Sequence, residues 1–125
     1  MVFNILVSNV DDHLRNHGFL RGSRGWNLSP LYDVESTPTE RHAGIWCTSV
    51  GDEDYHSTIE KTVDVAGLFR LSPEEARERL GRTVASVRKF RLLAKSLELP
   101  GEEIRLMASA YEHEESEWAI RFCGL

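Results

Sequence analysis

The stretch DDHLRN at residues 11–16 is the most informative part of this sequence, together with LYD at residues 31–33. The first stretch contains an Asp-x-His-x-x-Asn pattern from Asp11 to Asn16, and Asp33 follows 17 residues after Asn16. Phosphoryl transfer uses one carboxylate to orient the attacking hydroxyl, and an Asn and a second Asp to hold Mg²⁺. The pattern therefore predicts a base at Asp11 and magnesium ligands at Asn16 and Asp33.

The segment between these two stretches predicts a small β-hairpin. Two short apolar runs, at residues 17–20 and 26–28, flank a turn rich in Gly and Ser, and Pro30 ends the second run. An isolated Asp-x-His-x-x-Asn pattern is equally compatible with a simple turn, because Asp and Asn often cap backbone groups in turns. The added hairpin and the Tyr-Asp pair favour the catalytic interpretation.

Length and composition indicate one compact domain or a piece of a larger one. The chain has 125 residues, of which 41% are hydrophobic and 28% charged, as in ordinary globular proteins. Its net charge of −5 argues against direct nucleic-acid binding, which needs a clustered basic excess. No apolar run approaches the ~20 residues that cross a membrane, and the start lacks the basic region of a signal peptide. Cys47 and Cys123 have no zinc-type spacing, so we expect reduced thiols in a cytoplasmic protein.

The expected fold class is mainly α with a small β-hairpin. The apolar run from Met1 to Val7 is compatible with a buried strand or with the last turns of a buried helix, and residues 8–16 form a polar loop. Residues 45–50 resemble a short strand, and residues 35–44 and 51–57 are polar. From Thr58 onward the pattern is helical, and it predicts a bundle of roughly three helices.

The second of these helices has the clearest start, with Ser72 at the N-cap, Pro73 at the first helical position and Glu75 two residues later. Its apolar stripe extends to Leu97, and it predicts the longest helix, with the stripe in the core. The apolar positions of the three helices are, in turn, Ile59, Val63, Ala66 and Phe69; Ala76, Leu80, Val84, Val87, Phe90, Ala94 and Leu97; and Ile104, Met107, Ala108, Tyr111 and Trp118.

Residues 9–19 and 28–34 together resemble the catalytic segment of HipA-like serine/threonine kinases, the toxins of bacterial type II toxin–antitoxin modules. The Asp-x-His-x-x-Asn spacing is also similar to that of phosphatidylinositol 3-kinase-like enzymes. The HipA-like resemblance is closer, because Pro-Leu-Tyr-Asp at residues 30–33 stands where most kinases have Asp-Phe-Gly. It implies the C-terminal helical lobe of a protein-kinase-like fold over residues 1–125. Within it, residues 1–34 would form the catalytic and metal-binding segment, and residues 58–125 the helical bundle.

The resemblance also implies the roles of individual residues and the partners. Asp11 matches the catalytic aspartate, while Asn16 and Asp33 match the residues that bind Mg²⁺ and thereby the nucleotide. His13 matches the family's histidine, which either orients the loop or touches phosphate. ATP would be the substrate of the complete enzyme, and the expected partners are a HipB-like antitoxin and a protein substrate.

Several parts of a kinase are missing from this sequence. It contains no Gly-rich loop upstream of Asp11, no strand Lys for the phosphates and no Glu partner for that Lys. We therefore expect a C-terminal fragment from a truncated or split gene, inactive alone and in need of a separate N-terminal lobe. Two alternatives remain open. One is a non-catalytic module that binds an antitoxin or that separate lobe, and the other, ranked lower, is a small metal-dependent hydrolase.

The remaining polar and aromatic residues near the motif are given ordinary roles. Asp12 is expected to face solvent or to cap the loop, and Arg15 to lie on the surface. Trp26 and Trp46 are expected to pack in or near the core. The histidines outside the motif are expected to be surface or loop residues: His17, His42, His56 and His113.

Overall fold

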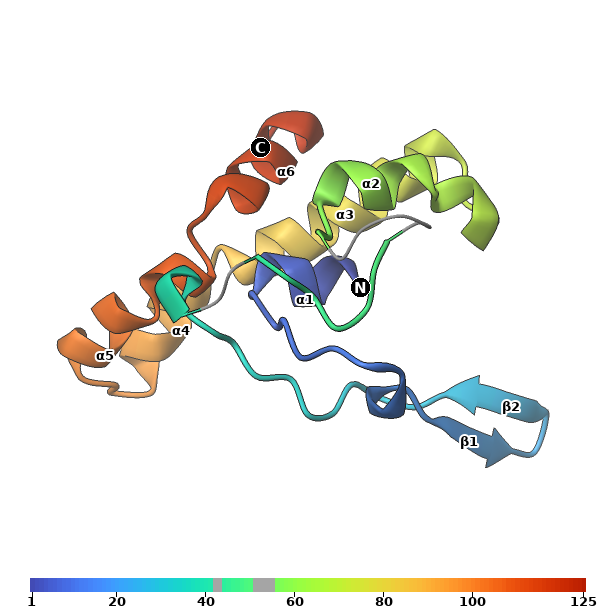
Figure 1. Ribbon diagram of the computed structural model, residues 1–125, viewed down its shortest axis with the longest axis horizontal. Coiled ribbons are helices and arrows are strands. Elements are labelled where there is room, and N and C mark those ends of the chain that lie inside the picture. The colour runs from blue at the N-terminus through green and yellow to red at the C-terminus, as the bar shows by residue number, and fades with distance from the viewer. Residues whose placement is uncertain (42–43, 51–55) are drawn as a thin grey trace.

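The computed structural model describes residues 1–41, 44–50 and 56–125, and His42 lies outside them. The described part is mainly helical with one antiparallel hairpin (Figure 1), which confirms the expected fold class. The strands are β1 (Phe19–Gly22) and β2 (Gly25–Leu28). The helices are α1 (Val2–Leu6), α2 (Ile59–Asp64), α3 (Pro73–Val87), α4 (Phe90–Ser96), α5 (Gly101–Leu106) and α6 (Glu114–Cys123). Short 3₁₀ turns span Leu14–Asn16, Thr39–Arg41, Ala66–Phe69 and Ala108–Ala110.

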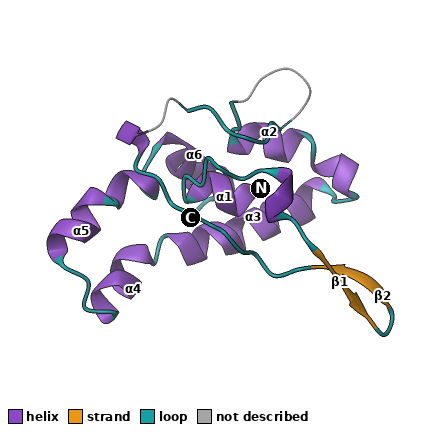
Figure 2. Cartoon of the chain, turned by 60° about the horizontal axis from the view of Figure 1, so that its bottom comes forward, coloured by secondary structure: helices purple, strands orange, loops and turns teal. Residues whose placement is uncertain are grey.

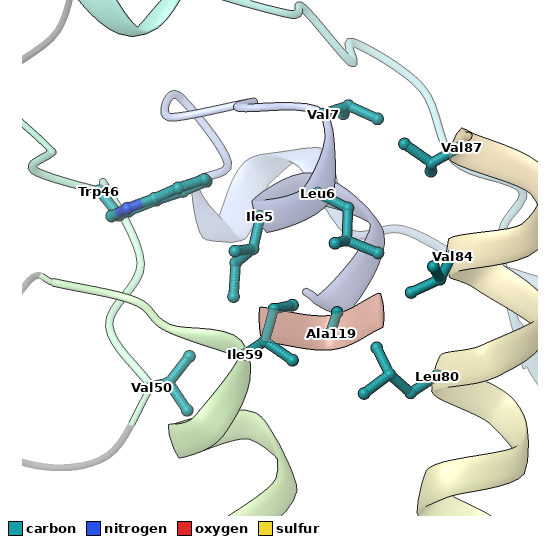
Figure 3. Packing of buried hydrophobic residues seen from close by; sticks show 10 residues of the cluster. All are labelled: Ile5, Leu6, Val7, Trp46, Val50, Ile59, Leu80, Val84, Val87 and Ala119. Carbon is teal, nitrogen blue, oxygen red and sulfur yellow. The ribbon is translucent and has the colours of Figure 1, made fainter. Parts of the chain in front are cut away.

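The N-terminal apolar run forms a helix, which settles the choice left open by the sequence. Ile5 and Leu6 are 1% exposed, and α1 lies in contact with α2, α3 and α6. Figure 3 shows how their side chains meet those of the surrounding helices in one cluster. A five-residue helix has little stability of its own, so the surrounding apolar contacts hold it in place. The cluster consists of Ile5, Leu6, Val7, Trp46, Val50, Ile59, Leu80, Val84, Val87 and Ala119.

Helix α3 begins as the sequence predicts and is the longest helix of the described residues, at 15 residues. The Ser72 hydroxyl accepts a hydrogen bond from the Glu75 N–H at 3.2 Å, and the Glu75 carboxylate accepts one from the Ser72 N–H at 2.8 Å. This reciprocal pair satisfies donors that a helix start otherwise leaves unpaired. The first half of the predicted stripe is buried as expected, at Ala76, Leu80, Val84 and Val87.

The second half of that stripe does not continue the same helix, so the prediction of one helix to Leu97 is wrong. The chain turns after Val87, where the Lys89 N–H bonds to the Ser86 carbonyl at 3.1 Å, and it starts again as α4. The turn lets the Phe90 ring stack on Tyr111 with centroids 4.4 Å apart. Leu97 is 72% exposed, because the stripe beyond the turn no longer faces the central cluster.

The other two predicted helices are also interrupted. The first shortens to α2 and is followed by the 3₁₀ turn Ala66–Phe69, which leaves Phe69 66% exposed. The last divides into α5, a 3₁₀ turn and α6, with His113 in extended conformation before α6. This break allows α6 to pack along α3, with Ala119 fully buried. The described residues after 58 therefore hold five α-helices rather than the roughly three expected.

The hairpin forms where the sequence predicts it. Its register pairs Phe19 with Leu28 and Arg21 with Trp26, and it projects away from the helices in both views (Figures 1 and 2). All eight strand residues are exposed. Trp26 is 67% exposed, so its expected packing in or near the core is wrong, whereas Trp46 is 8% exposed and packs as expected.

Residues 45–50 do not form the expected strand. The Cys47 N–H donates to the Val10 carbonyl at 2.9 Å, but this segment has no regular secondary structure, and a single backbone bond does not make a ladder. Burial of Trp46 and Val50 explains the apolar pattern instead, since both enter the central cluster. None of the helices in the described ranges is long and apolar enough to cross a membrane.

Candidate active site

The predicted catalytic loop follows directly after α1, which is buried in the core. Helix α1 ends at Leu6, and Ser8 then adopts φ +52° and is buried. The Asn9 side chain, 1% exposed, donates to the Asn4 side-chain oxygen at 3.3 Å. These contacts attach the start of the loop to α1, whose side chains are packed in the core. The polar residues that follow are therefore positioned by a rigid element.

The structure brings Asn16 and Asp33 together across the hairpin. The Asn16 Nδ2 donates to the Asp33 Oδ2 at 2.7 Å, and the Asn16 Oδ1 accepts from the His13 N–H at 3.1 Å. Asn16 is buried, whereas Asp33 is exposed. Because strands β1 and β2 run antiparallel, the two ends of the hairpin return to the same place, and this closes a 17-residue separation in sequence.

The backbone around Asp33 is held in an unusual conformation. Asp33 has φ +55°, a left-handed value that is uncommon outside Gly but tolerated by Asp. The preceding Tyr32 hydroxyl donates to the Arg15 carbonyl at 2.6 Å. This bond ties the Asp33 segment to the 3₁₀ turn that carries Asn16, so both side chains are positioned by the same small unit.

Asp11 lies on the exposed side of the loop and is not bonded to Asn16 or Asp33. Its Oδ1 accepts a hydrogen bond from the Cys47 thiol at 3.2 Å. This bond, with a smaller effect of the Asp11 charge, raises the pKa of the Cys47 thiol. The Asp11 carboxylate is exposed, and a general base must be within hydrogen-bond reach of the substrate proton.

Asp12 does not face solvent, which corrects the first of its two expected roles. It is 5% exposed, and its Oδ1 lies 2.9 Å from the Nε2 of His17. A buried carboxylate requires such a partner, because burying an unpaired charge is costly. His17 is half-buried, and through its contact with Asp12 it is part of the loop structure.

His13 contributes to the site through its backbone. It occupies the N-cap of the 3₁₀ turn Leu14–Asn16, and its N–H holds the Asn16 side chain. Its ring Nδ1 is buried and has no hydrogen-bond partner within the described part of the chain. The backbone contact supports a role in orienting the loop, the first of its two expected roles.

Asp33 and Asn16 carry oxygen atoms of the kind that bind a magnesium ion, while in this structure the Asn16 Nδ2 is the atom that faces Asp33. Mg²⁺ prefers hard oxygen ligands and is commonly bound by one or two carboxylates together with substrate phosphates. The Asp33 carboxylate is exposed, and the Asn16 amide oxygen keeps a second lone pair beyond its bond to His13. Residues 1–41, 44–50 and 56–125 contain no group of three or more His, Cys, Asp and Glu side chains able to hold a metal.

Sequence reasoning did not find three residues that contact this site. Cys47 and Thr48 reach the loop from 36 residues away, with the Thr48 hydroxyl donating to the Asp12 carbonyl. Tyr32 belongs to the Leu-Tyr-Asp motif at residues 31–33, but the sequence pattern predicts no role for it. A Cys-Thr pair at this distance carries no sequence signal, because only the fold brings it to the loop. Both cysteines are free thiols.

The fold and the site define a class of protein, a mainly helical domain in which a loop and a hairpin present an Asp-x-His-x-x-Asn set and a second Asp. Among models of known families, the HipA-like C-terminal domain matches residues 1–90. The match includes the loop, the hairpin and all of α3, and the chain belongs to this family. No curated protein and no solved structure matches the chain.

Proposed function

We propose that this domain is the phosphoryl-transfer lobe of a cytoplasmic HipA-like serine/threonine protein kinase. The observation that carries the proposal is the 2.7 Å contact between Asn16 and Asp33. Two residues chosen from the sequence as magnesium ligands, 17 positions apart, are in contact, and Asp11 is an exposed carboxylate on the same loop as Asn16. Family membership through residues 1–90 supports the same assignment, since all three residues lie within the match.

In the proposed reaction, each side chain has one task. Asn16 and Asp33 would hold Mg²⁺, which neutralises phosphate charge when bound. Asp11 would orient the serine or threonine hydroxyl of a protein substrate and accept its proton as the oxygen attacks the γ-phosphorus of ATP. His13 would keep the Asn16 side chain in place through its backbone N–H.

The exposed hairpin supports the participation of a second polypeptide lobe. Cross-strand pairing places Phe19, Arg21, Trp26 and Leu28 on one face, and each of the three apolar residues is more than 60% exposed. A two-stranded hairpin is marginally stable in water without something packed on it. The hairpin joins Asn16 to Asp33, so a lobe that encloses ATP at these residues would also cover this face. We propose a separate N-terminal lobe in this role, within a toxin–antitoxin module that includes a HipB-like antitoxin.

The same hairpin favours one alternative, a non-catalytic module that binds an antitoxin or a kinase lobe. Exposed aromatic residues near an Arg are typical of protein interfaces, and this role does not need Asp11 or Asp33. The two functions differ in one respect that is easily measured. Only the kinase lobe requires the polar loop to bind a metal–nucleotide complex.

The experiment that tests the proposal uses Mn²⁺ in place of Mg²⁺ on the ¹⁵N-labelled 125-residue chain. Mn²⁺ is paramagnetic, so it broadens the NMR signals of nearby nuclei even when binding is weak. With ATP present, we expect selective broadening at residues 11–16 and 32–34. Asp33→Asn should remove most of this broadening, because it takes the only carboxylate from the proposed ligand pair.

Asp64→Asn provides a matched control, since Asp64 is an exposed carboxylate at the end of α2. It should leave the broadening at the loop unchanged. Broadening that is spread over the acidic surface and is equal in the wild type and Asp33→Asn would contradict the proposed site. That result would favour the non-catalytic module.

A further inference from the structure

We propose that Cys47 and Thr48 are positioning residues that hold the Asp11 loop in its reactive geometry. This inference rests on the proposed function, because the geometry is reactive only if Asp11 is the base. The contacts themselves are independent of that assignment. The segment that carries both residues has no regular secondary structure, and Trp46 buries it in the core.

Three contacts from this segment reach three consecutive residues of the loop. The Cys47 N–H donates to the Val10 carbonyl at 2.9 Å, the Cys47 thiol donates to the Asp11 Oδ1 at 3.2 Å, and the Thr48 hydroxyl donates to the Asp12 carbonyl. They involve the residue before the base, the base itself and the residue after it. Together they restrict both the loop backbone and the Asp11 side chain.

The segment that makes these contacts is itself fixed to the core. Trp46 is 8% exposed and belongs to the central cluster, where Figure 3 shows its ring beside Ile5. On the other side, the Ser57 hydroxyl donates to the Thr48 carbonyl at 3.1 Å. The contacts to the loop therefore connect it to the packed interior rather than to another exposed segment.

The chemistry of a thiol donor suits this task. Asp11 is exposed, so without a partner its side chain would be free to change rotamer in solvent. A neutral thiol holds Oδ1 without placing a positive charge beside the carboxylate, and a cation there would make the base weaker. Among residues 1–41, 44–50 and 56–125, no hydrogen bond engages the second Asp11 carboxylate oxygen, so this oxygen is left for the proton of a substrate hydroxyl.

The test follows the Asp11 side chain directly, by three-bond NMR couplings that report its χ1 rotamer in the full 125-residue chain. The wild type should show one dominant rotamer. In Cys47→Ala the ratio of this rotamer to the others should fall about threefold to tenfold, the effect of one lost hydrogen bond. Cys47→Ser keeps a donor of similar reach and should restore most of the ratio, whereas Cys123→Ala should change nothing.

The Thr48 contact is tested by hydrogen exchange at the Cys47 amide, which bonds to Val10. Exchange there should accelerate in Thr48→Val, which loses the hydroxyl, and should remain slow in Thr48→Ser. Equal Asp11 rotamer ratios in the wild type and Cys47→Ala would overturn the proposal, as would unchanged exchange in Thr48→Val. Neither readout requires phosphoryl transfer, so a failure of the kinase assignment would be seen separately, in the experiment with Mn²⁺ and ATP.

Discussion

Asn16 connects His13 to Asp33 through one side chain. Its oxygen accepts from the His13 backbone and its nitrogen donates to Asp33, so its orientation is determined from both ends. The residue is 6% exposed, and a buried amide with both groups engaged has little freedom to rotate. This geometry shows how a neutral side chain holds the Asp33 carboxylate in place.

Reactivity of the Cys47 thiol gives the first prediction. The hydrogen bond to the Asp11 carboxylate raises the pKa of Cys47, Asp12 adds to the increase and Arg15 opposes it. The thiolate is the nucleophile, so a higher pKa means slower alkylation at pH 8. Asp11→Asn removes the charge, should lower the pKa, and should make alkylation by iodoacetamide several times faster at this pH.

The measurement uses mass spectrometry over a pH series in a Cys123→Ser background, so that one thiol reacts. The alkylation profile of Asp11→Asn should lie at lower pH than that of the parent chain. Asp33→Asn serves as the control, because it removes a carboxylate from the same site without touching Cys47, and its profile should not move. Identical profiles for Asp11→Asn and the parent would show that the thiol and the carboxylate do not interact.

The second prediction compares two tryptophans of opposite burial. Trp46 packs in the central cluster at 8% exposure, while Trp26 on β2 is 67% exposed. Trp46→Ala should lower the free energy of unfolding by about 3–5 kcal/mol, as for other large core truncations. Trp26→Ala should change it by less than about 0.5 kcal/mol. Urea unfolding monitored by circular dichroism measures both free energies. A loss of stability in Trp26→Ala as large as that in Trp46→Ala would mean that the hairpin is packed in solution.

Within single elements, local capping residues predict where a helix starts better than apolar periodicity predicts where it ends. The capping residues Ser72, Pro73 and Glu75 define the beginning of α3 by bonds within four residues, and the structure has those bonds. The helix ends at Val87, and beyond the turn Phe90 stacks on Tyr111, a contact between residues 21 positions apart. Apolar periodicity continues through the turn to Leu97, so it could not show the break.

The cap of α3 provides the third prediction. Ser72→Ala removes the hydroxyl that accepts from the Glu75 N–H, and it should cost about 1 kcal/mol in the free energy of unfolding. Ser86→Ala is the matched control, since its exposed hydroxyl bonds to the Arg82 carbonyl within the same helix. Chemical denaturation of both variants should show a clear loss for Ser72→Ala alone. Equal effects would mean that the capping box does not stabilise the fold.

The candidate site shows a similar division between local and distant information. Spacing and residue type predict Asp11, Asn16 and Asp33 as site residues, and the structure shows Asn16 and Asp33 in contact. Burial of Asp12 and the approach of Cys47 could not be predicted in this way. Both depend on segments 36 residues apart meeting at the loop, and the apolar pattern that brings them there was taken for a strand.

At the scale of the whole molecule, the helices form a support and the polar loop and hairpin stand to one side of it (Figure 1). The sequence contains no Gly-rich loop and no strand Lys ahead of Asp11. Positioning and charge stabilisation supply nearly all of the catalysis in phosphoryl transfer. The fourth prediction is that the pure 125-residue chain neither hydrolyses ATP nor phosphorylates protein at a useful rate. Radiolabel transfer from ATP measures this, and robust transfer that Asp11→Ala abolishes would show that no further lobe is needed.

We propose that Asp33 and Asn16 bind the metal while Asp11 serves as the base, and nucleotide affinity distinguishes these two roles. The measurement is an NMR titration of the chain with Mg²⁺–ATP, repeated for Asp33→Asn and Asp11→Asn. Asp33→Asn should weaken binding by at least about tenfold, the usual scale for disturbing a metal site, and Asp11→Asn should leave it within about twofold. Loss of binding in Asp11→Asn, with unchanged binding in Asp33→Asn, would contradict the account and reverse the two assignments.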